Sequence, residues 1–127
     1  MLERGKGRII NIASIDALVG EPISSVYCAS KGGVMALTVE LALELGPKNI
    51  TVNAIAPGTI ATPMSDLALK NPAVKNEMII RTPVRRIGMP SDVAEAALFF
   101  AKDGTEFITG TLLCVDGGWM ADSHVAY

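Results

Sequence analysis

Short apolar runs alternate with longer helical repeats along the chain. Residues 8–13 read RIINIA and residues 49–57 read NITVNAIAP, and both runs are rich in β-branched side chains beside turn-forming residues. Runs of this length and composition predict short buried strands. A third run, GTLLCV at residues 110–115, ends in the turn DGG and predicts a third strand.

Two longer stretches have apolar residues at helical spacing. Residues 24–45 include VMALTVELALEL, which is apolar on more than one side, and Gly46 and Pro47 follow as stop signals. Such a helix is expected to be buried on most of its surface, against its own sheet and a partner subunit. Residues 90–103 predict a second, amphipathic helix with Ser91 as its N-cap.

Residues 59–90 contain four prolines and have no regular pattern. We expect short, mobile helices and loops there. The order strand, helix, strand, insert, helix, strand predicts an α/β fold with a parallel sheet of about three strands. Right-handed crossovers would place the two long helices on opposite faces only if the strand order changes direction.

The composition indicates one globular domain with a core. The chain has 127 residues, 50% of them hydrophobic, and a net charge of -2. This balance argues against disorder and against a nucleic-acid-binding surface. The apolar run near the N-terminus is too short for a signal peptide, and no run reaches the 18 or more residues of a membrane span. We therefore expect no nucleic-acid and no membrane partner.

The remaining chemistry-bearing residues exclude several kinds of site. Cys28 and Cys114 form no CxxC pair, so we expect both to be reduced and buried in a cytoplasmic protein. His124 is the only histidine and is expected to be solvated in the tail. HExxH, EF-hand, GxSxG and SxxK patterns are absent, so we expect no metal site and no serine hydrolase.

Polar residues gather where the predicted strands end. Ser14 follows the first strand, and Tyr27 and Lys31 lie four apart at the start of the long helix, on one face. Ligands of open α/β sheets bind outside the carboxyl ends of the strands. Residues 57–64, PGTIATPM, leave the second strand at the same edge. Each feature alone fits a surface pair, a cap or a turn, but together they predict one site.

The spacing Ser-x12-Tyr-x3-Lys resembles the active-site signature of the short-chain dehydrogenase/reductase family. The resemblance extends over residues 5–119, and its segments occur in the family's order. These segments are GRIINIAS, YCASKGGVMALTVELALEL, ITVNAIAPGTIATPM and RIGMPSDVAEAALFFAKD followed by FITGTLLCVDGG. The resemblance implies a Rossmann-like doubly wound parallel sheet and an NAD- or NADP-dependent oxidoreductase acting on a small carbonyl or alcohol.

The resemblance also implies roles for single residues. Tyr27 would exchange a proton with the substrate oxygen, with Ser14 holding that oxygen. An ammonium group beside a phenol favours its ionised form, which suits general acid–base catalysis. Lys31 would also bind the nicotinamide ribose. The implied cofactor-binding residues are Tyr27, Lys31, Pro57, Gly58, Ile60 and Thr62.

The chain resembles only the C-terminal half of the family's domain. It lacks the glycine-rich, dinucleotide-binding half, because GKGRII precedes a strand and has isoleucine in place of the last glycine of GxGxxG. We expect residues 1–127 to be a partial domain, truncated and inactive alone. It comprises the Ser/Tyr/Lys segment, a substrate-loop insert at about residues 65–89, and the last helix and strand. An apolar lid over the substrate is expected from Met64, Leu67, Leu69, Met78 and Ile79.

Two further interpretations stay open. The chain can be a non-catalytic oligomerisation or interaction module derived from the family, built on the helix at residues 24–45. Alternatively, Ser14 and Lys31 can perform hydrolysis without a cofactor. By analogy with the family, the expected assembly is a homo-oligomer, a dimer or tetramer. The sequence does not choose between NAD and NADP.

Overall fold

The structure is a computed structural model of the chain and describes residues 1–121. Its centre is a parallel sheet of three strands, in the order β1-β2-β3. The strands are β1 (Gly7–Ile12), β2 (Ile50–Pro57) and β3 (Leu112–Val115). The predicted α/β class and all three predicted strands are confirmed, with boundaries that differ by one or two residues.

The register of the sheet brings the three carboxyl ends together. Gly7 pairs with Ile50 and Ile12 with Ile55 across β1 and β2, while Pro57 pairs with Val115 across β2 and β3. β2 is central and is buried along almost its whole length. Its continuous burial explains its mostly apolar sequence, since a parallel strand covered on both faces has no solvent-exposed side; Thr51 and Asn53 are its buried polar residues.

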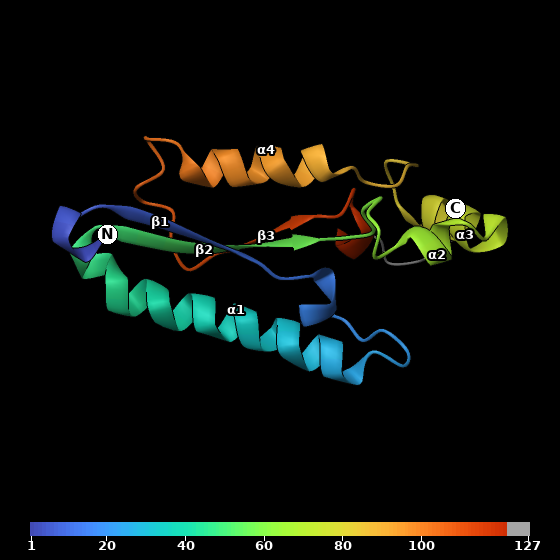
Figure 1. Cartoon of the computed structure of the whole chain (residues 1–127), viewed down its shortest axis with the longest axis horizontal. Helices are drawn as coiled ribbons and strands as arrows, with labels where there is room; N and C mark the ends of the chain where they lie inside the picture. The colour runs from blue at the N-terminus through green and yellow to red at the C-terminus, as the bar shows by residue number, and fades with distance from the viewer. Residues whose placement is uncertain (122–127) are drawn as a thin grey trace.

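Two long helices cover the sheet, one on each face (Figure 1). They are α1 (Ser25–Leu45) and α4 (Pro90–Ala101), as predicted from the helical spacing. The strand order nevertheless advances in one direction, so the two crossovers have opposite hands. The rule that opposite faces require a change of direction applies to right-handed crossovers, and here only one of the two crossovers is right-handed. The second connection also carries the long insert at residues 58–89 before α4.

The insert contains two short helices, α2 (Asp66–Leu69) and α3 (Pro72–Arg81), beyond the carboxyl end of the sheet (Figure 1). Asn71 caps α3, because its side chain accepts hydrogen bonds from the Ala73 and Val74 amides at 3.0 and 3.5 Å. Single-turn 3₁₀ helices complete the fold: η1 (Leu2–Arg4), η2 (Ile15–Ala17), η3 (Gly46–Lys48) and η4 (Trp119–Ala121).

Helix α4 begins one residue before the predicted cap. Met89 is the N-cap and Pro90 takes the first helical position, where a missing N–H costs nothing. Asp92 accepts a hydrogen bond from the Met89 amide at 2.7 Å and binds the Arg86 guanidinium through both carboxylate oxygens. Ser91 therefore lies inside the helix, and its prediction as the cap was wrong.

The surroundings of α1 differ from the predicted burial. Only Thr38 and Ala42 are buried within this helix, while Val26, Leu37 and Leu43 are exposed. The helix has the length and apolar composition of a membrane-spanning segment, which was not predicted from the sequence. Little of it is buried. Core helices of globular proteins and signal sequences can meet the same two criteria.

The cysteines are free, as predicted, but neither is fully buried. Cys28 and Cys114 are both half-buried. Burial, with a smaller contribution from the nearby Asp116 carboxylate, raises the pKa of the Cys114 thiol. The prediction of a solvated His124 concerns a residue outside the described part of the chain.

Candidate active site

A cleft of about 950 Å³ opens at the carboxyl ends of the strands. Its walls come from the segment after β1, the first turns of α1, the segment after β2, and the insert. Ser14, Tyr27 and Lys31 all line it, as do Pro57, Gly58, Ile60 and Thr62. Every residue predicted for the site therefore lines one cleft, although Ser14 and Thr62 are far apart in the sequence.

Ser14 is positioned by the turn that follows β1. Its side-chain oxygen accepts a hydrogen bond from the Asp16 amide at 3.1 Å and so caps η2. The residue is only 7% exposed. A hydroxyl that accepts one bond keeps its hydrogen for another acceptor. Ser14 can therefore donate to an oxygen atom of a ligand in the cleft.

Tyr27 and Lys31 lie on one face of the first two turns of α1. The Lys31 ammonium is 5.6 Å from the centroid of the Tyr27 ring and donates a hydrogen bond to the Ile12 carbonyl at 3.0 Å. This bond joins the helix to the end of β1. An ammonium has three donors, so two remain available to a ligand. Tyr27 is 36% exposed, so its phenol is accessible from the cleft.

The turn after β2 is held against the turn after β3. The Gly58 amide donates to the Val115 carbonyl at 3.0 Å. A side chain at Gly58 would lie 3.0 Å from the Asp116 Cα atom, so glycine is required by this close approach. Pro57 ends β2 and pairs with Val115. These contacts fix the floor of the cleft.

The segment that follows, which contains Ile60 and Thr62, is held in place by Ser65, a residue that was not predicted for the site. The Ser65 hydroxyl donates to the Ile60 carbonyl at 2.6 Å and accepts a hydrogen bond from the Thr62 amide at 3.1 Å. The backbone of Ile60 and Thr62 is thus partly engaged within the chain. The Thr62 side chain still lines the cleft. A serine three residues after a threonine, in a segment without periodicity, gave no signal of this bridge.

The predicted apolar lid is present only in part. Met64 and Met78 line the cleft, but Leu67, Leu69 and Ile79 do not. Leu67 on α2 is 86% exposed. The insert instead contributes charged residues, Glu77 and Arg81, which were not predicted for the site.

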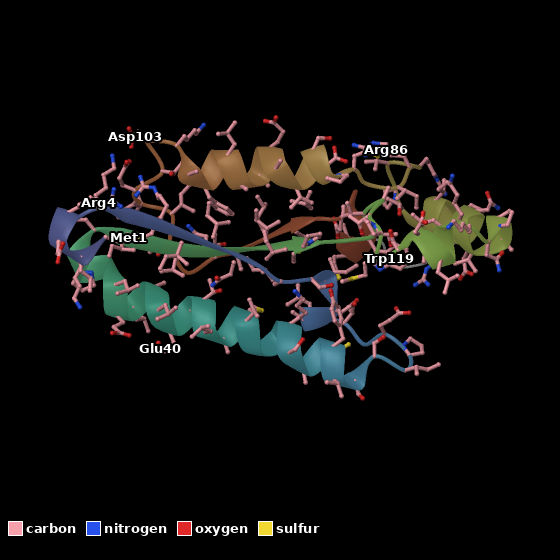
Figure 2. The ribbon with its side chains drawn as sticks, in the orientation of Figure 1. Met1, Arg4, Glu40, Arg86, Asp103 and Trp119 are labelled. Carbon is pink, nitrogen blue, oxygen red and sulfur yellow. The ribbon has the colours of Figure 1, made fainter. Side chains whose placement is uncertain are left out.

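The C-terminal segment forms a further wall. Trp119 lines the cleft, and the Arg81 guanidinium lies 4.3 Å from the centroid of its indole ring. Figure 2 shows Trp119 at the end of the molecule that carries α2 and α3. Within residues 1–121, no group of three histidine, cysteine, aspartate or glutamate side chains is arranged to hold a metal ion.

The same half of a known fold recurs in proteins of one family. The family model described as enoyl-(acyl carrier protein) reductase matches residues 1–120. The 3-oxoacyl-[acyl-carrier-protein] reductase of Chlamydia trachomatis is 47% identical over 118 residues, which are 93% of this chain and 47% of that protein. The 2-(S)-hydroxypropyl-CoM dehydrogenase 3 of Xanthobacter autotrophicus is 40% identical over 125 residues, or 95% of this chain and 49% of that protein.

Solved structures agree with these relatives. The crystal structure of a gluconate 5-dehydrogenase from Burkholderia cenocepacia, in complex with NADP and tartrate, superposes with a TM-score of 0.92 at 32% identity. The superposition covers 95% of this chain and 48% of that one. The chain thus spans about half the length of the relatives that it matches. With its three-stranded parallel sheet and the match over residues 1–120, the chain belongs to the short-chain dehydrogenase/reductase family.

Proposed function

We propose that this chain supplies the catalytic part of an NAD(P)-dependent oxidoreductase that interconverts a carbonyl and an alcohol. The observation that carries the proposal is the shared cleft of Ser14, Tyr27 and Lys31 at the carboxyl edge of the sheet. A hydroxyl donor, a phenol and an ammonium in one cleft are the groups that a proton transfer to a carbonyl oxygen requires.

The residues present fit the nicotinamide side of the cofactor. The donor set contains an ammonium with two free N–H groups on Lys31 and the hydroxyl of Thr62, which suit a ribose and a carboxamide. Tyr27, Pro57, Gly58 and Ile60 complete the proposed cofactor site. The cleft of about 950 Å³ is large enough for this part of the cofactor and a small substrate. NADP is bound in related solved structures, which supports a nicotinamide cofactor.

The chain's own residues would manage the proton. The bound cofactor supplies or accepts the hydride. Ser14 donates a hydrogen bond to the substrate oxygen and holds it beside the phenol. Tyr27 delivers its proton to that oxygen as charge develops, or removes it in the opposite direction. Lys31 stabilises the ionised phenol and orients the ribose, while its bond to Ile12 keeps the ammonium in place.

These roles suggest how the chain is organised and what kind of substrate it binds. Residues 1–127 would form a partial domain, with the insert at about residues 65–89 closing over a small-molecule substrate. Relatives with different substrates in their names both match this chain, an acyl-carrier-protein reductase at 47% identity and a gluconate dehydrogenase at 32%. We therefore assign the substrate only to carbonyl and alcohol compounds, and we place the protein in the cytoplasm with no membrane or nucleic-acid partner.

We further propose that the chain acts as a homo-oligomer, a dimer or tetramer. This proposal rests on the exposed apolar surface of α1. The second candidate function, a non-catalytic interaction module, rests on the same surface. Val26 is 83% exposed and Leu43 is 77% exposed. A module of this kind needs the helix surface but not the cleft.

Nucleotide binding by the purified 127-residue chain tests the proposal. NADH and NADPH are titrated while the emission of Trp119, the single tryptophan, is followed. We expect saturable binding that Lys31→Ala weakens and Lys48→Ala, in η3 beyond the C-terminal end of α1, leaves unchanged. A folded chain without binding up to millimolar nucleotide would favour the interaction module. Turnover of an ester without nucleotide would instead support cofactor-free hydrolysis.

A further inference from the structure

Arg81 is a cleft residue that the proposed hydride-transfer chemistry does not use. It ends α3, and it lines the same cleft as Tyr27 and Lys31. Among the described residues that line the cleft, Lys31 and Arg81 are the cations. Lys31 is tied to the Ile12 carbonyl and to the proposed cofactor site. Arg81 is therefore the cation available to a part of the substrate remote from the reacting carbon.

The guanidinium of Arg81 lies over the indole ring of Trp119. Its central carbon is 4.3 Å from the centroid of the Trp119 ring. Stacking on an aromatic ring uses the face of the guanidinium and leaves the N–H donors at its edge directed outward. A rigid edge of paired donors matches a carboxylate, sulfonate or phosphate better than a mobile ammonium does.

The position of Trp119 is itself fixed by packing. The turn before it presses against the segment that follows α3, because a side chain at Gly117 would come within 2.7 Å of Val84 and Thr82 side-chain atoms. The Val84 amide also donates to the Gly117 carbonyl at 3.2 Å. The two partners of the stack are thus carried by segments that are fastened to each other, which orders the guanidinium in advance of binding.

Among residues 1–121, Glu77 is the ionic partner of the guanidinium, and the pairing is weak. Glu77 lies one turn earlier on α3, with its carboxylate 4.0 Å from the Arg81 guanidinium, beyond hydrogen-bond distance. Both side chains are substantially exposed. Exposed helical pairs of this kind contribute little, so a ligand anion can displace Glu77.

We propose that Arg81, stacked on Trp119, recognises an anionic group of the substrate. The inference rests on the proposed function, since it places the reacting carbonyl or alcohol at Tyr27 and the anion at Arg81. The substrate class is then a small oxo or hydroxy compound that carries a carboxylate, sulfonate or phosphate. The apolar side chains of Met64 and Met78 line the cleft and suit the carbon chain between these two ends.

Matched ligands test the anion site independently of turnover. Acetoacetate and methyl acetoacetate share the same ketone and differ in the negative charge, and 2-oxopropanesulfonate presents a sulfonate instead. Each is titrated into the ¹⁵N-labelled 127-residue chain, in which Trp119 gives the single indole N–H resonance. We expect both anions to shift this resonance saturably and the ester to bind at least about fivefold more weakly. Preference for one anion over the other identifies the group.

Variants assign the effect to Arg81. Arg81→Gln should weaken the binding of acetoacetate by about tenfold or more, because a charged hydrogen bond is lost. The affinity for the ester should stay unchanged. The affinity of Arg81→Lys for acetoacetate should lie between those of the unmodified chain and Arg81→Gln, since lysine keeps the charge without the paired donors. Glu77→Gln should increase the affinity for the anion about twofold, because it removes the carboxylate that competes for Arg81. Lys75→Gln removes a charge from the same helix outside the cleft and should change nothing.

Equal binding of acetoacetate and its ester would overturn the anion site, as would an equal loss in Lys75→Gln. If Arg81→Gln does not fold, the other two variants decide: unchanged anion affinity in both Arg81→Lys and Glu77→Gln would also overturn it. NADPH binding that depends on Lys31, without anion binding that depends on Arg81, keeps the proposed function and removes the anion site. Anion binding that depends on Arg81, without NADPH binding that depends on Lys31, removes the proposed function instead.

Discussion

The Lys31 ammonium donates a hydrogen bond to the Ile12 carbonyl at 3.0 Å, which joins helix α1 to the carboxyl end of strand β1. The bond crosses between two elements that the sequence separates by a long turn. It sets the direction of the remaining Lys31 donors, and through them the geometry of the proposed ribose site. The position of helix α1 is thus linked to the position of the sheet edge.

The first prediction concerns this link. Lys31→Met should weaken NADPH binding by about tenfold or more, since it removes charged hydrogen bonds. It should also lower the free energy of unfolding by about 1 kcal/mol, because the Ile12 carbonyl loses its partner. Fluorescence titration and urea unfolding measure the two effects. Lys48→Met is the matched control, and an equal loss of affinity in that variant would contradict the assignment.

The second prediction separates chemistry from binding. In a protein that also supplies the dinucleotide-binding half, Tyr27→Phe removes only the phenolic oxygen and should reduce the hydride-transfer rate by about a hundredfold or more, the usual contribution of a positioned acid or base. NADPH affinity should change by less than about tenfold, because a single neutral hydrogen bond contributes only about 0.5–1.5 kcal/mol. Single-turnover oxidation of NADPH measures the rate. A Tyr27→Phe chain with undiminished turnover would assign the proton transfer to another group.

Much of the fold was predictable because its signals are local. β-branched runs and the stop signals at Gly46 and Pro47 gave every strand and long helix to within a few residues. The meeting of Ser14, Tyr27 and Lys31 also followed from the sequence, because parallel strands present their carboxyl ends at one edge.

The missed features depend on contacts between distant segments. Arg81 and Trp119 meet through the packing of Gly117 against the insert, and no local pattern marks that contact. The placement of α1 and α4 on opposite faces depends on the path of the insert, not on the periodicity of either helix. Ser91 resembled a cap because the sequence alone does not show that Pro90 already fits the first helical turn.

The third prediction tests the polar part of the core. Asn53 in β2 is 1% exposed; its side chain donates to the Ile108 carbonyl at 2.8 Å and accepts from the Thr111 amide at 3.2 Å. Asn53→Ala should therefore lower the free energy of unfolding by about 1–3 kcal/mol, since two part-buried hydrogen bonds to backbone groups are lost. Urea unfolding measures this, with the exposed Asn76→Ala as control. Equal midpoints for both variants would show that the bonds are not needed.

The fourth prediction concerns acid stability at the start of α4. The hydrogen bonds from the Arg86 guanidinium, and then from the Met89 amide, lower the pKa of Asp92 to about 2 from its usual 3.8. A lowered pKa in the folded chain means that the carboxylate stabilises the fold above about pH 4. This contribution should disappear as the pH falls from about 4 to about 2.

Urea midpoints measured between pH 7 and pH 2 follow this change. In Asp92→Asn the titrating group is gone, so the midpoint should be lower at pH 7 and fall less steeply between pH 4 and pH 2. Arg86→Met should shift the steep region of the profile upward, because it removes the main cause of the lowered pKa. A profile for Asp92→Asn identical to that of the unmodified chain would refute the role of this pair.

The last prediction concerns the apolar surface of α1. Leu37 and Leu43 are 51% and 77% exposed, whereas the same helix buries Thr38 and Ala42 against the sheet. Glu40, labelled in Figure 2, points away from the sheet and lies on the outer side of the helix. The apolar outer surface is therefore interrupted by charge, which suits an interface with a polar rim better than a hydrocarbon environment.

If this surface joins two copies of the chain, a charge placed in it must be desolvated on association. Leu43→Glu should raise the dissociation constant of the oligomer by about tenfold or more without lowering the free energy of unfolding of the monomer. Sedimentation velocity over a concentration series measures the association, and Glu95→Gln on the opposite helix is a control. Flotation of the unmodified chain with phosphatidylcholine vesicles, lost in Leu43→Glu, would assign the surface to a membrane instead.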